Sequence, residues 1–148
     1  MDSGAEKVSE HFVAPSFEGE KGEVERVQTH FGIADTNFAE TFLEKARGGT
    51  LQALSDKLWD MLENTESCPK NLEKGDWNAV AEYASVHKPP RDWQDLKRKM
   101  QSNVPVDAPV IAKRGDVLHL VSGNTRLLVA RALGIRPNVL IVDITDVQ

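Results

Sequence analysis

The sequence VLHLVSGNTRLLVARALGIRPNVLIVDI, residues 117–144, decides the fold. Its first five residues are apolar except for His119, and this composition predicts a largely buried strand. Ser122-Gly123 ends the strand, and either Ser122 or Asn124 can cap the helix that follows.

The remainder of this stretch predicts a helix and a second strand. Good helix formers fill residues 125–133, and Gly134 is typical of the residue just after a helix. Pro137 is expected to prevent the helix from continuing. The apolar run 138–144 then predicts a short strand.

A β-hairpin is expected immediately before this stretch. Residues 104–114 carry two prolines, so we expect a strand there only from about Ala108, near the edge of a sheet. Gly115-Asp116 is the predicted two-residue turn into Val117.

The N-terminal half is predicted to be mainly helical. Apolar side chains recur at helical spacing in five segments, which end at glycines or before prolines. The predicted helices cover 24–31, 38–46, 51–62, 76–88 and 92–103, with Thr36 or Asn37, Thr50, Asp76 and Asp92 as caps. Trp77 and Trp93 each follow an Asp cap, and either pack against neighbouring side chains or stack on a nucleobase.

The chain length of 148 residues favours a single domain with a substantial hydrophobic core. We expect residues 1–21 to form a flexible arm, which Phe12, Val13 and Phe17 can partly anchor. Residues 22–148 then form one domain, with a helical front over 22–103 and an α/β core over 104–148.

The composition, 40% hydrophobic and 28% charged, is typical of a globular protein. We expect a cytoplasmic protein that does not contact a membrane, because no secretory signal or membrane-spanning stretch is visible. The single cysteine, Cys68, cannot form an intramolecular disulfide. The four histidines have no spacing typical of metal ligands, so we expect no metal site in the protein.

Charge is distributed unevenly along the chain. Residues 1–90 hold nine Lys and Arg against 17 Asp and Glu, a net charge of −8. Residues 91–148 hold nine against six, a net of +3, which gives the −5 of the whole chain. DNA binding is therefore not indicated by net charge, although the basic residues of 91–136 form either one local patch or an ordinary solvated surface.

The turn between the predicted strand and helix is a candidate anion site. A helix that begins at this turn leaves the backbone N–H groups of Asn124 and Thr125 without helical partners, at the positive end of the helix dipole. Arg126 would add a fixed positive charge with bidentate donors. Either a phosphate-bearing ligand binds here, or Arg126 forms a salt bridge with Asp143 or Asp146.

Residues 108–144 resemble the core of the ParB/sulfiredoxin superfamily, in its ParB N-terminal-like form. In that superfamily a hairpin leads into a G-x-x-R turn, a helix with small residues, a glycine and a strand. The matching segments are PVIAK at 109–113, the turn at Gly115-Asp116, HLVSG at 119–123, Arg126, Ala130, LG at 133–134 and VLIV at 139–142. The resemblance implies an α+β fold, in which a small mixed sheet of this type follows the helical N-terminal half.

The resemblance also implies a nucleotide site, because the G-x-x-R turn of that superfamily holds the phosphates of CTP or ATP. The residues carried over are Ser122, Gly123, Asn124, Thr125 and Arg126, with His119 as a further candidate. Mg²⁺ would arrive with the nucleotide, helped by a carboxylate such as Asp107, Asp116 or Asp143. The implied function is nucleotide binding, with weak NTPase or phosphotransfer activity in a DNA- or phage-related role.

The chain also departs from the better-known members of this superfamily. Sulfiredoxins place a catalytic cysteine where this chain has Asn124, so we expect no reduction of sulfinic acids. ParB clamps have G-E-R-R at the turn and need further domains after the core, so a DNA-segregating clamp is not expected. The resemblance is to the small stand-alone members, which suggests a phage or plasmid origin.

Three functions remain open from the sequence. The first is a nucleotide-binding protein. The second is a metal-dependent nuclease or kinase, although no pair of residues stands out as nucleophile and general base. The third is a protein-interaction domain with an inactive nucleotide site, which binds a partner through its acidic helical front.

Overall fold

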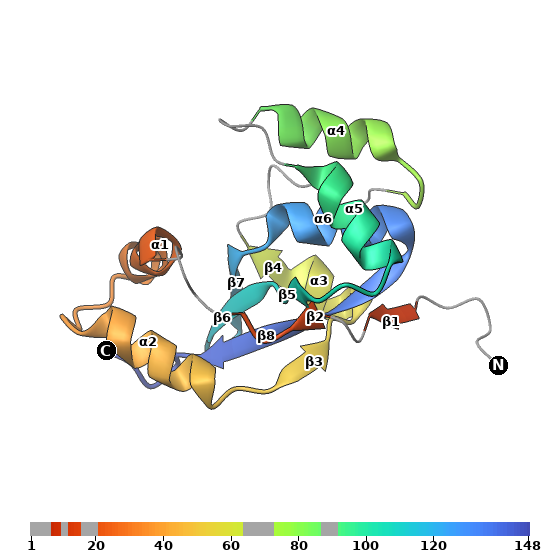
Figure 1. Ribbon diagram of the computed structural model, residues 1–148. Coiled ribbons are helices and arrows are strands. Elements are labelled where there is room, and N and C mark those ends of the chain that lie inside the picture. Colours follow the sequence, from red (N-terminus) through yellow and green to blue (C-terminus); the bar gives the residue numbers. More distant parts are fainter. Residues whose placement is uncertain (1–6, 10–11, 16–20, 64–72, 87–91) are drawn as a thin grey trace.

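The computed structural model describes residues 7–9, 12–15, 21–63, 73–86 and 92–148, and this part of the chain has an α+β fold (Figure 1). Its helices are α1 Lys21–Phe31, α2 Phe38–Arg47, α3 Asp56–Met61, α4 Trp77–Ser85, α5 Trp93–Gln101 and α6 Asn124–Leu133. Its strands are β1 Lys7–Ser9, β2 Phe12–Val13, β3 Leu51–Ala53, β4 Leu62–Glu63, β5 Val106–Asp107, β6 Val110–Arg114, β7 Val117–Ser122 and β8 Ile135–Asp143. None of the helices in these ranges is long and apolar enough to cross a membrane.

The predicted hairpin, helix and strand are confirmed. The hairpin strands β6 and β7 and the strand β8 form the centre of the sheet, and the helix α6 connects β7 to β8. β6 and β7 pair antiparallel through the turn at Gly115-Asp116, and β8 returns parallel to β6 after α6. The sheet order is β1-β8-β6-β7-β4, so β6 is a central strand and our prediction of an edge position is wrong. Both prolines that prompted it, Pro105 and Pro109, lie before β6 and remove no N–H from it.

The ends of α6 differ from the prediction. Gly123 is the N-cap, without a side-chain hydrogen bond, so neither Ser122 nor Asn124 caps the helix. Gly134 ends α6 in a left-handed conformation with φ +75°, as its position indicated. β8 begins at once, and Pro137 lies inside this strand, where its carbonyl accepts the Leu54 amide at 3.0 Å.

Four of the five predicted N-terminal helices are confirmed as α1, α2, α4 and α5. The Asp76 and Asp92 carboxylates accept amide hydrogen bonds at 3.2 and 3.0 Å, as predicted for N-caps. The predicted helix 51–62 is wrong. β3 pairs with β8, Ser55 caps the short helix α3 by accepting from the Leu58 amide, and β4 pairs with β7.

Two short strands lie within the predicted N-terminal arm. Lys7–Ser9 pair parallel with Ile135–Pro137, which extends the sheet beside β8. Phe12–Val13 pair parallel with β5, and the Phe12 side chain has no exposed surface. Val13 is 36% exposed, so Phe12 is the anchor of this segment, and Phe17 lies outside the described residues.

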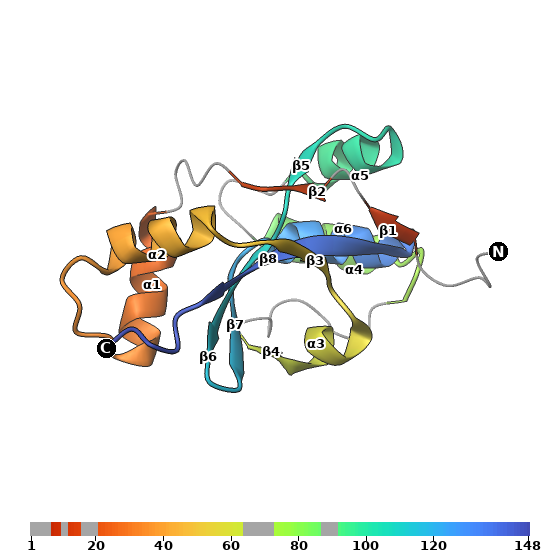
Figure 2. The ribbon, with the colours of Figure 1, turned by 90° about the horizontal axis from the view of Figure 1, so that it is seen from below.

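Three hydrophobic clusters join the helices to the sheet. In Figure 1, α4, α5 and α6 lie together on one side of the molecule, and α1 and α2 lie at the end where β8 finishes. Figure 2 shows α3 on the side of the sheet away from α5. The most buried side chains of the three clusters include Val27, Phe42 and Ile144; Phe12, Val80 and Val129; and Leu54, Leu120 and Leu127.

Trp77 and Trp93 stack on each other between α4 and α5. Their ring centroids are 5.5 Å apart and their planes differ by 18°. Lys97 places its ammonium group 4.3 Å from the centre of the Trp77 ring. These contacts support the packing interpretation of both indoles.

Candidate functional site

The turn between β7 and α6 is built around Gly123. Its φ of +113° and ψ of +18° are unfavourable for a residue with a side chain. The Leu127 amide donates to the Gly123 carbonyl at 2.9 Å, which is the first hydrogen bond of α6. The amides of residues 124–126 precede this bond, so they project from the N-terminal end of the helix.

Gly123 also packs closely against Pro109. A Cβ atom at position 123 would lie 2.7 Å from Pro109 Cβ and 2.9 Å from Pro109 Cα. The resemblance carries Gly123 over as a phosphate contact. In the structure Pro109 occupies the space beside its Cα on the Cβ side, so the packing of the protein itself requires glycine here.

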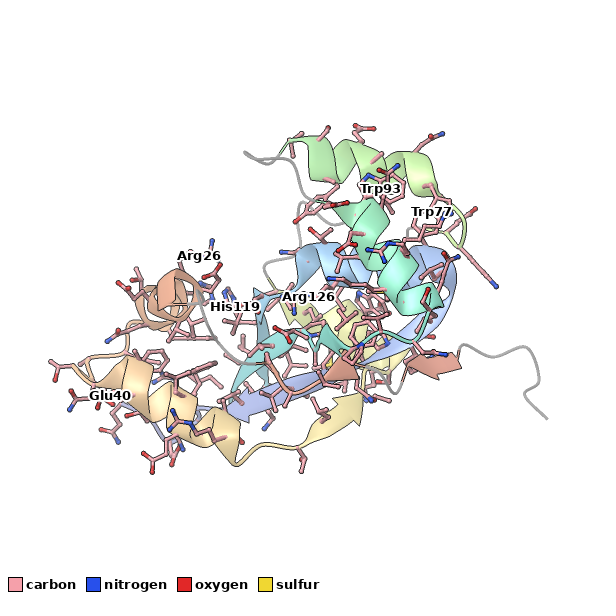
Figure 3. All side chains as sticks on the ribbon, in the orientation of Figure 1. Arg26, Glu40, Trp77, Trp93, His119 and Arg126 are labelled. Atoms are coloured by element: carbon pink, nitrogen blue, oxygen red, sulfur yellow. The ribbon has the colours of Figure 1, made fainter. Side chains whose placement is uncertain are left out.

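Arg126 lies on the first turn of α6 and reaches the segment before β6. Its Nη1 atom donates to the Asp107 carbonyl at 2.7 Å and is 3.4 Å from the Ala108 carbonyl. In Figure 3, Arg126 lies between α5 and the sheet. These backbone contacts hold the guanidinium group in a fixed position beside the N-terminus of α6.

The alternative partners of Arg126, Asp143 and Asp146, are bound to other residues. Asp143 accepts hydrogen bonds from the Thr145 hydroxyl at 2.6 Å and the Thr145 amide at 3.0 Å, and these bonds lower the pKa of Asp143. Asp146 binds Lys45 at 3.0 Å, and this hydrogen bond lowers the pKa of Asp146. The structure gives Arg126 backbone contacts in place of either proposed salt bridge.

An open groove of about 320 Å³ lies beside Arg126. It is lined by Leu96, Lys99, Pro105, Val106, Asp107 and Arg126. Lys99 is bound to Asp95 at 3.1 Å on the same helix, and this contact is the first cause of the lowered pKa of Asp95. The groove therefore has two cationic side chains and one carboxylate in its wall.

The other predicted turn residues are partly buried. Ser122, Asn124 and Thr125 all have intermediate exposure at the end of β7 and the start of α6. The Ser122 Oγ atom is buried and has no hydrogen-bond partner among the described residues. The structure thus brings together Ser122, Gly123, Asn124, Thr125 and Arg126 at one turn.

Of the three carboxylates considered for Mg²⁺, only Asp107 lies at the groove. Asp116 is in the hairpin turn, at the opposite end of β7 from Gly123. Asp143 pairs with Lys113 beside the same turn, with a distance of 3.6 Å between Lys113 Nζ and Asp143 Oδ2. A strand of six residues separates these two groups from the β7–α6 turn.

His119 lies in a different group of side chains from the turn residues. It is 7% exposed on β7, and its ring stacks on His30 of α1 at 4.1 Å between centroids. His119 Nδ1 and His30 Nε2 lie 3.4 and 3.1 Å from the same oxygen, Glu63 Oε1. Sequence reasoning missed His30 and Glu63 here, because the three residues come from distant segments.

The basic residues of 91–136 are spread over several elements. Lys97 lies over Trp77 on α4, Lys113 is at the hairpin turn, and Arg131 lies over Trp59 at 4.5 Å. Arg136 donates to the Leu54 carbonyl at 2.6 Å. Apart from Arg91, which lies outside the described residues, this distribution favours separate local roles over one DNA-binding patch.

Comparison with protein-family models, curated proteins and solved structures finds no match to this chain. The fold therefore places the chain in the α+β class. Its candidate site is a groove at the start of α6 that is lined by the cationic side chains of Lys99 and Arg126.

Proposed function

We propose that this protein binds the phosphate groups of a nucleotide, CTP or ATP with Mg²⁺, at the turn between β7 and α6. The observation that supports this function best is the position of Arg126, on the first turn of α6 and in the wall of the groove. Helix dipole and guanidinium charge therefore act at one place. The ParB/sulfiredoxin-like character of the core is part of the same proposal.

The charges around the groove favour an anion. The N-terminus of a helix carries a partial charge of about +0.5, and Arg126 and Lys99 add two cationic side chains. Asp107 is the single carboxylate among the lining residues of this groove in the described part of the chain. The volume of about 320 Å³ is at the lower end of the range for small-molecule sites, roughly 300–1,000 Å³.

The cationic groups are held in place before any ligand binds. Arg126 is fixed by the Asp107 carbonyl, and the turn is fixed by the contact of Gly123 with Pro109. A site that needs no ordering on binding loses less of its interaction free energy to conformational entropy. This rigidity supports binding through the backbone amides of Asn124 and Thr125.

Asp107 is the residue we assign to Mg²⁺ in this proposal. Mg²⁺ prefers oxygen ligands and commonly joins one or two carboxylates to substrate phosphates. The Asp107 side chain is exposed at the groove, and its backbone carbonyl accepts from Arg126. Weak NTPase or phosphotransfer activity is a further part of the proposal, for which release of inorganic phosphate is the measurement.

The order of elements supports the ParB-like part of the proposal. A hairpin, a glycine turn with an arginine three residues on, a helix and a strand parallel to the first hairpin strand follow one another as expected. The turn carries the residues that correspond to the phosphate-binding G-x-x-R of that superfamily, Gly123 and Arg126.

The experiment is a thermal-shift and calorimetric screen of ATP, CTP, GTP and UTP with Mg²⁺. A nucleotide at 100 times its dissociation constant stabilises the folded state by about 2.7 kcal/mol, which is readily seen as a shift in Tm. We expect one nucleotide to bind wild type, and binding to weaken strongly in Arg126→Ala and Lys99→Ala.

Arg98→Ala is the matched control. Arg98 lies on α5 next to Lys99 and binds the same partner, Asp95, but it does not line the groove. Its substitution removes the same charge and should leave nucleotide affinity within about twofold, as for an exposed charge separated from the ligand. The proposal is wrong if no nucleotide binds, or if Arg98→Ala weakens binding as much as Lys99→Ala does. The protein-interaction domain would then be the better interpretation.

A further inference from the structure

His30, Glu63 and His119 bring one ligand atom each to a common point. The three residues lie on α1, β4 and β7, and their ligand atoms are all within 4.8 Å of one another. Glu63 and His119 are direct partners in the parallel pairing of β4 with β7. His30 reaches them from the C-terminal end of α1, which contacts β7.

We infer that these three residues bind a divalent transition-metal ion, for which Zn²⁺ is the probe. Two imidazoles and one carboxylate are a common ligand set for such ions. This site is separate from the proposed phosphate site, which depends on Arg126 and Lys99.

The two distances from Glu63 to the imidazoles suit tetrahedral coordination. With metal–ligand bonds of about 2.0–2.1 Å, neighbouring ligand atoms of a tetrahedron are about 3.3 Å apart. Glu63 Oε1 is 3.1 Å from His30 Nε2 and 3.4 Å from His119 Nδ1. Both distances match, so the carboxylate needs little movement.

The two imidazoles need a larger adjustment. Their rings are stacked, with an interplanar angle of 22° and centroids 4.1 Å apart, whereas a shared ion must lie in the plane of each ring. The His30 side chain is 45% exposed near the end of a helix, so it can rotate to open the stack. The His119 side chain is 9% exposed on β7 and provides the fixed ligand.

The surroundings of the three residues also suit a bound metal ion. Phe31 places its ring edge-on to both imidazoles, at 4.7 Å from His30 and 5.6 Å from His119, and shields one side of the site from water. The Glu63 side chain is 45% exposed, which gives an ion a path of entry. Three protein ligands leave a fourth position for water or another oxygen ligand, as in zinc sites that keep an open position.

The test is a calorimetric titration of Zn²⁺, supported by the visible absorption of Co²⁺ as a report on coordination. The variants are His30→Ala, Glu63→Gln and His119→Ala, all in a Cys68→Ser background so that the thiol adds no ligand. Glu40→Gln is the matched control, because Glu40 is exposed on α2, away from His119 (Figure 3).

We expect one Zn²⁺ per chain in the background protein and in Glu40→Gln. Loss of one ligand should weaken Zn²⁺ binding by more than about tenfold, since even substitution of a group behind a ligand costs 10- to 100-fold. His30 and Glu63 are both substantially exposed, so their variants should fold even if His119→Ala does not. The inference is overturned if the background protein binds no stoichiometric Zn²⁺, or if His30→Ala and Glu63→Gln bind it with unchanged affinity.

Discussion

Replacement of Gly123 by alanine tests how the β7–α6 turn is built. The φ of +113° places an alanine there in a conformation that costs about 1–2 kcal/mol. Its Cβ would also lie 2.7 and 2.9 Å from Pro109 Cβ and Cα, and one of these is a backbone atom that cannot simply rotate away. Overpacking of this kind costs about 1–3 kcal/mol, so we expect a total loss of about 2–5 kcal/mol.

Gly115→Ala separates the two contributions. Gly115 also has a positive φ, +60°, but a Cβ atom there would have no neighbour within 4 Å among the described residues. We therefore expect Gly115→Ala to cost only about 1–2 kcal/mol. Free energies of unfolding from urea titrations, followed by circular dichroism and compared at a shared m-value, provide the measurement. Equal losses in the two variants would refute the packing of Gly123 on Pro109.

Three further predictions concern single side chains. Asp92→Ala removes the acceptor of the Asp95 amide at the start of α5, and urea unfolding should show a loss of about 1 kcal/mol. Phe42→Ala should cost about 3–5 kcal/mol in the same assay, because the Phe42 side chain is fully buried; a loss below 1 kcal/mol would contradict its place in the core. Hydrogen bonds from Thr145 lower the pKa of Asp143 in the folded state below 3.8, so its ionised form adds stability above about pH 4 that is lost as the pH falls further. Asp143→Asn should therefore lower Tm slightly at pH 7 and less at pH 3, and a parallel pH profile for the two proteins would contradict this cause.

The sequence predicts the centre of the fold well, because the signals there are local. Gly115, Gly123 and Gly134 all have positive φ. Gly115 lies in the hairpin turn, and Gly123 and Gly134 lie at the two ends of α6, where the sequence predicted these boundaries. The N-caps Asp76 of α4 and Asp92 of α5 were also predictable, because an N-cap hydrogen bond involves only the next three residues. Local chemistry and observed structure agree at all of these positions.

The segment 51–62 shows where local signals fail. Its apolar residues have helical spacing, yet Leu51–Ala53 form a strand because β8 offers an edge to pair with. Ser55 was the available signal, since it caps α3 five residues after Thr50, the predicted cap. The pairing of Lys7–Ser9 with β8 had no comparable signal, because it depends on a partner 128 residues away in sequence (Lys7 with Ile135).

The two candidate sites also differ in how much of them is visible in the sequence. The turn residues of the proposed phosphate site could be named from the sequence because they are contiguous, whereas the groove wall from α5 depends on tertiary packing. The His30–Glu63–His119 cluster has no recognisable spacing, because three separate elements assemble it. One local signal did exist, since His119 is the one polar residue in the otherwise apolar run 117–121.

The most direct test of the proposed phosphate site is a titration followed by backbone amide NMR. CTP or ATP with Mg²⁺ is added to ¹⁵N-labelled protein, and the amide shifts are mapped along the chain. Phosphate binding at the N-terminus of α6 predicts the largest saturable shifts at Asn124, Thr125 and Arg126, and their loss in Arg126→Ala. Saturable shifts confined to another surface, or none with any nucleotide, would contradict it.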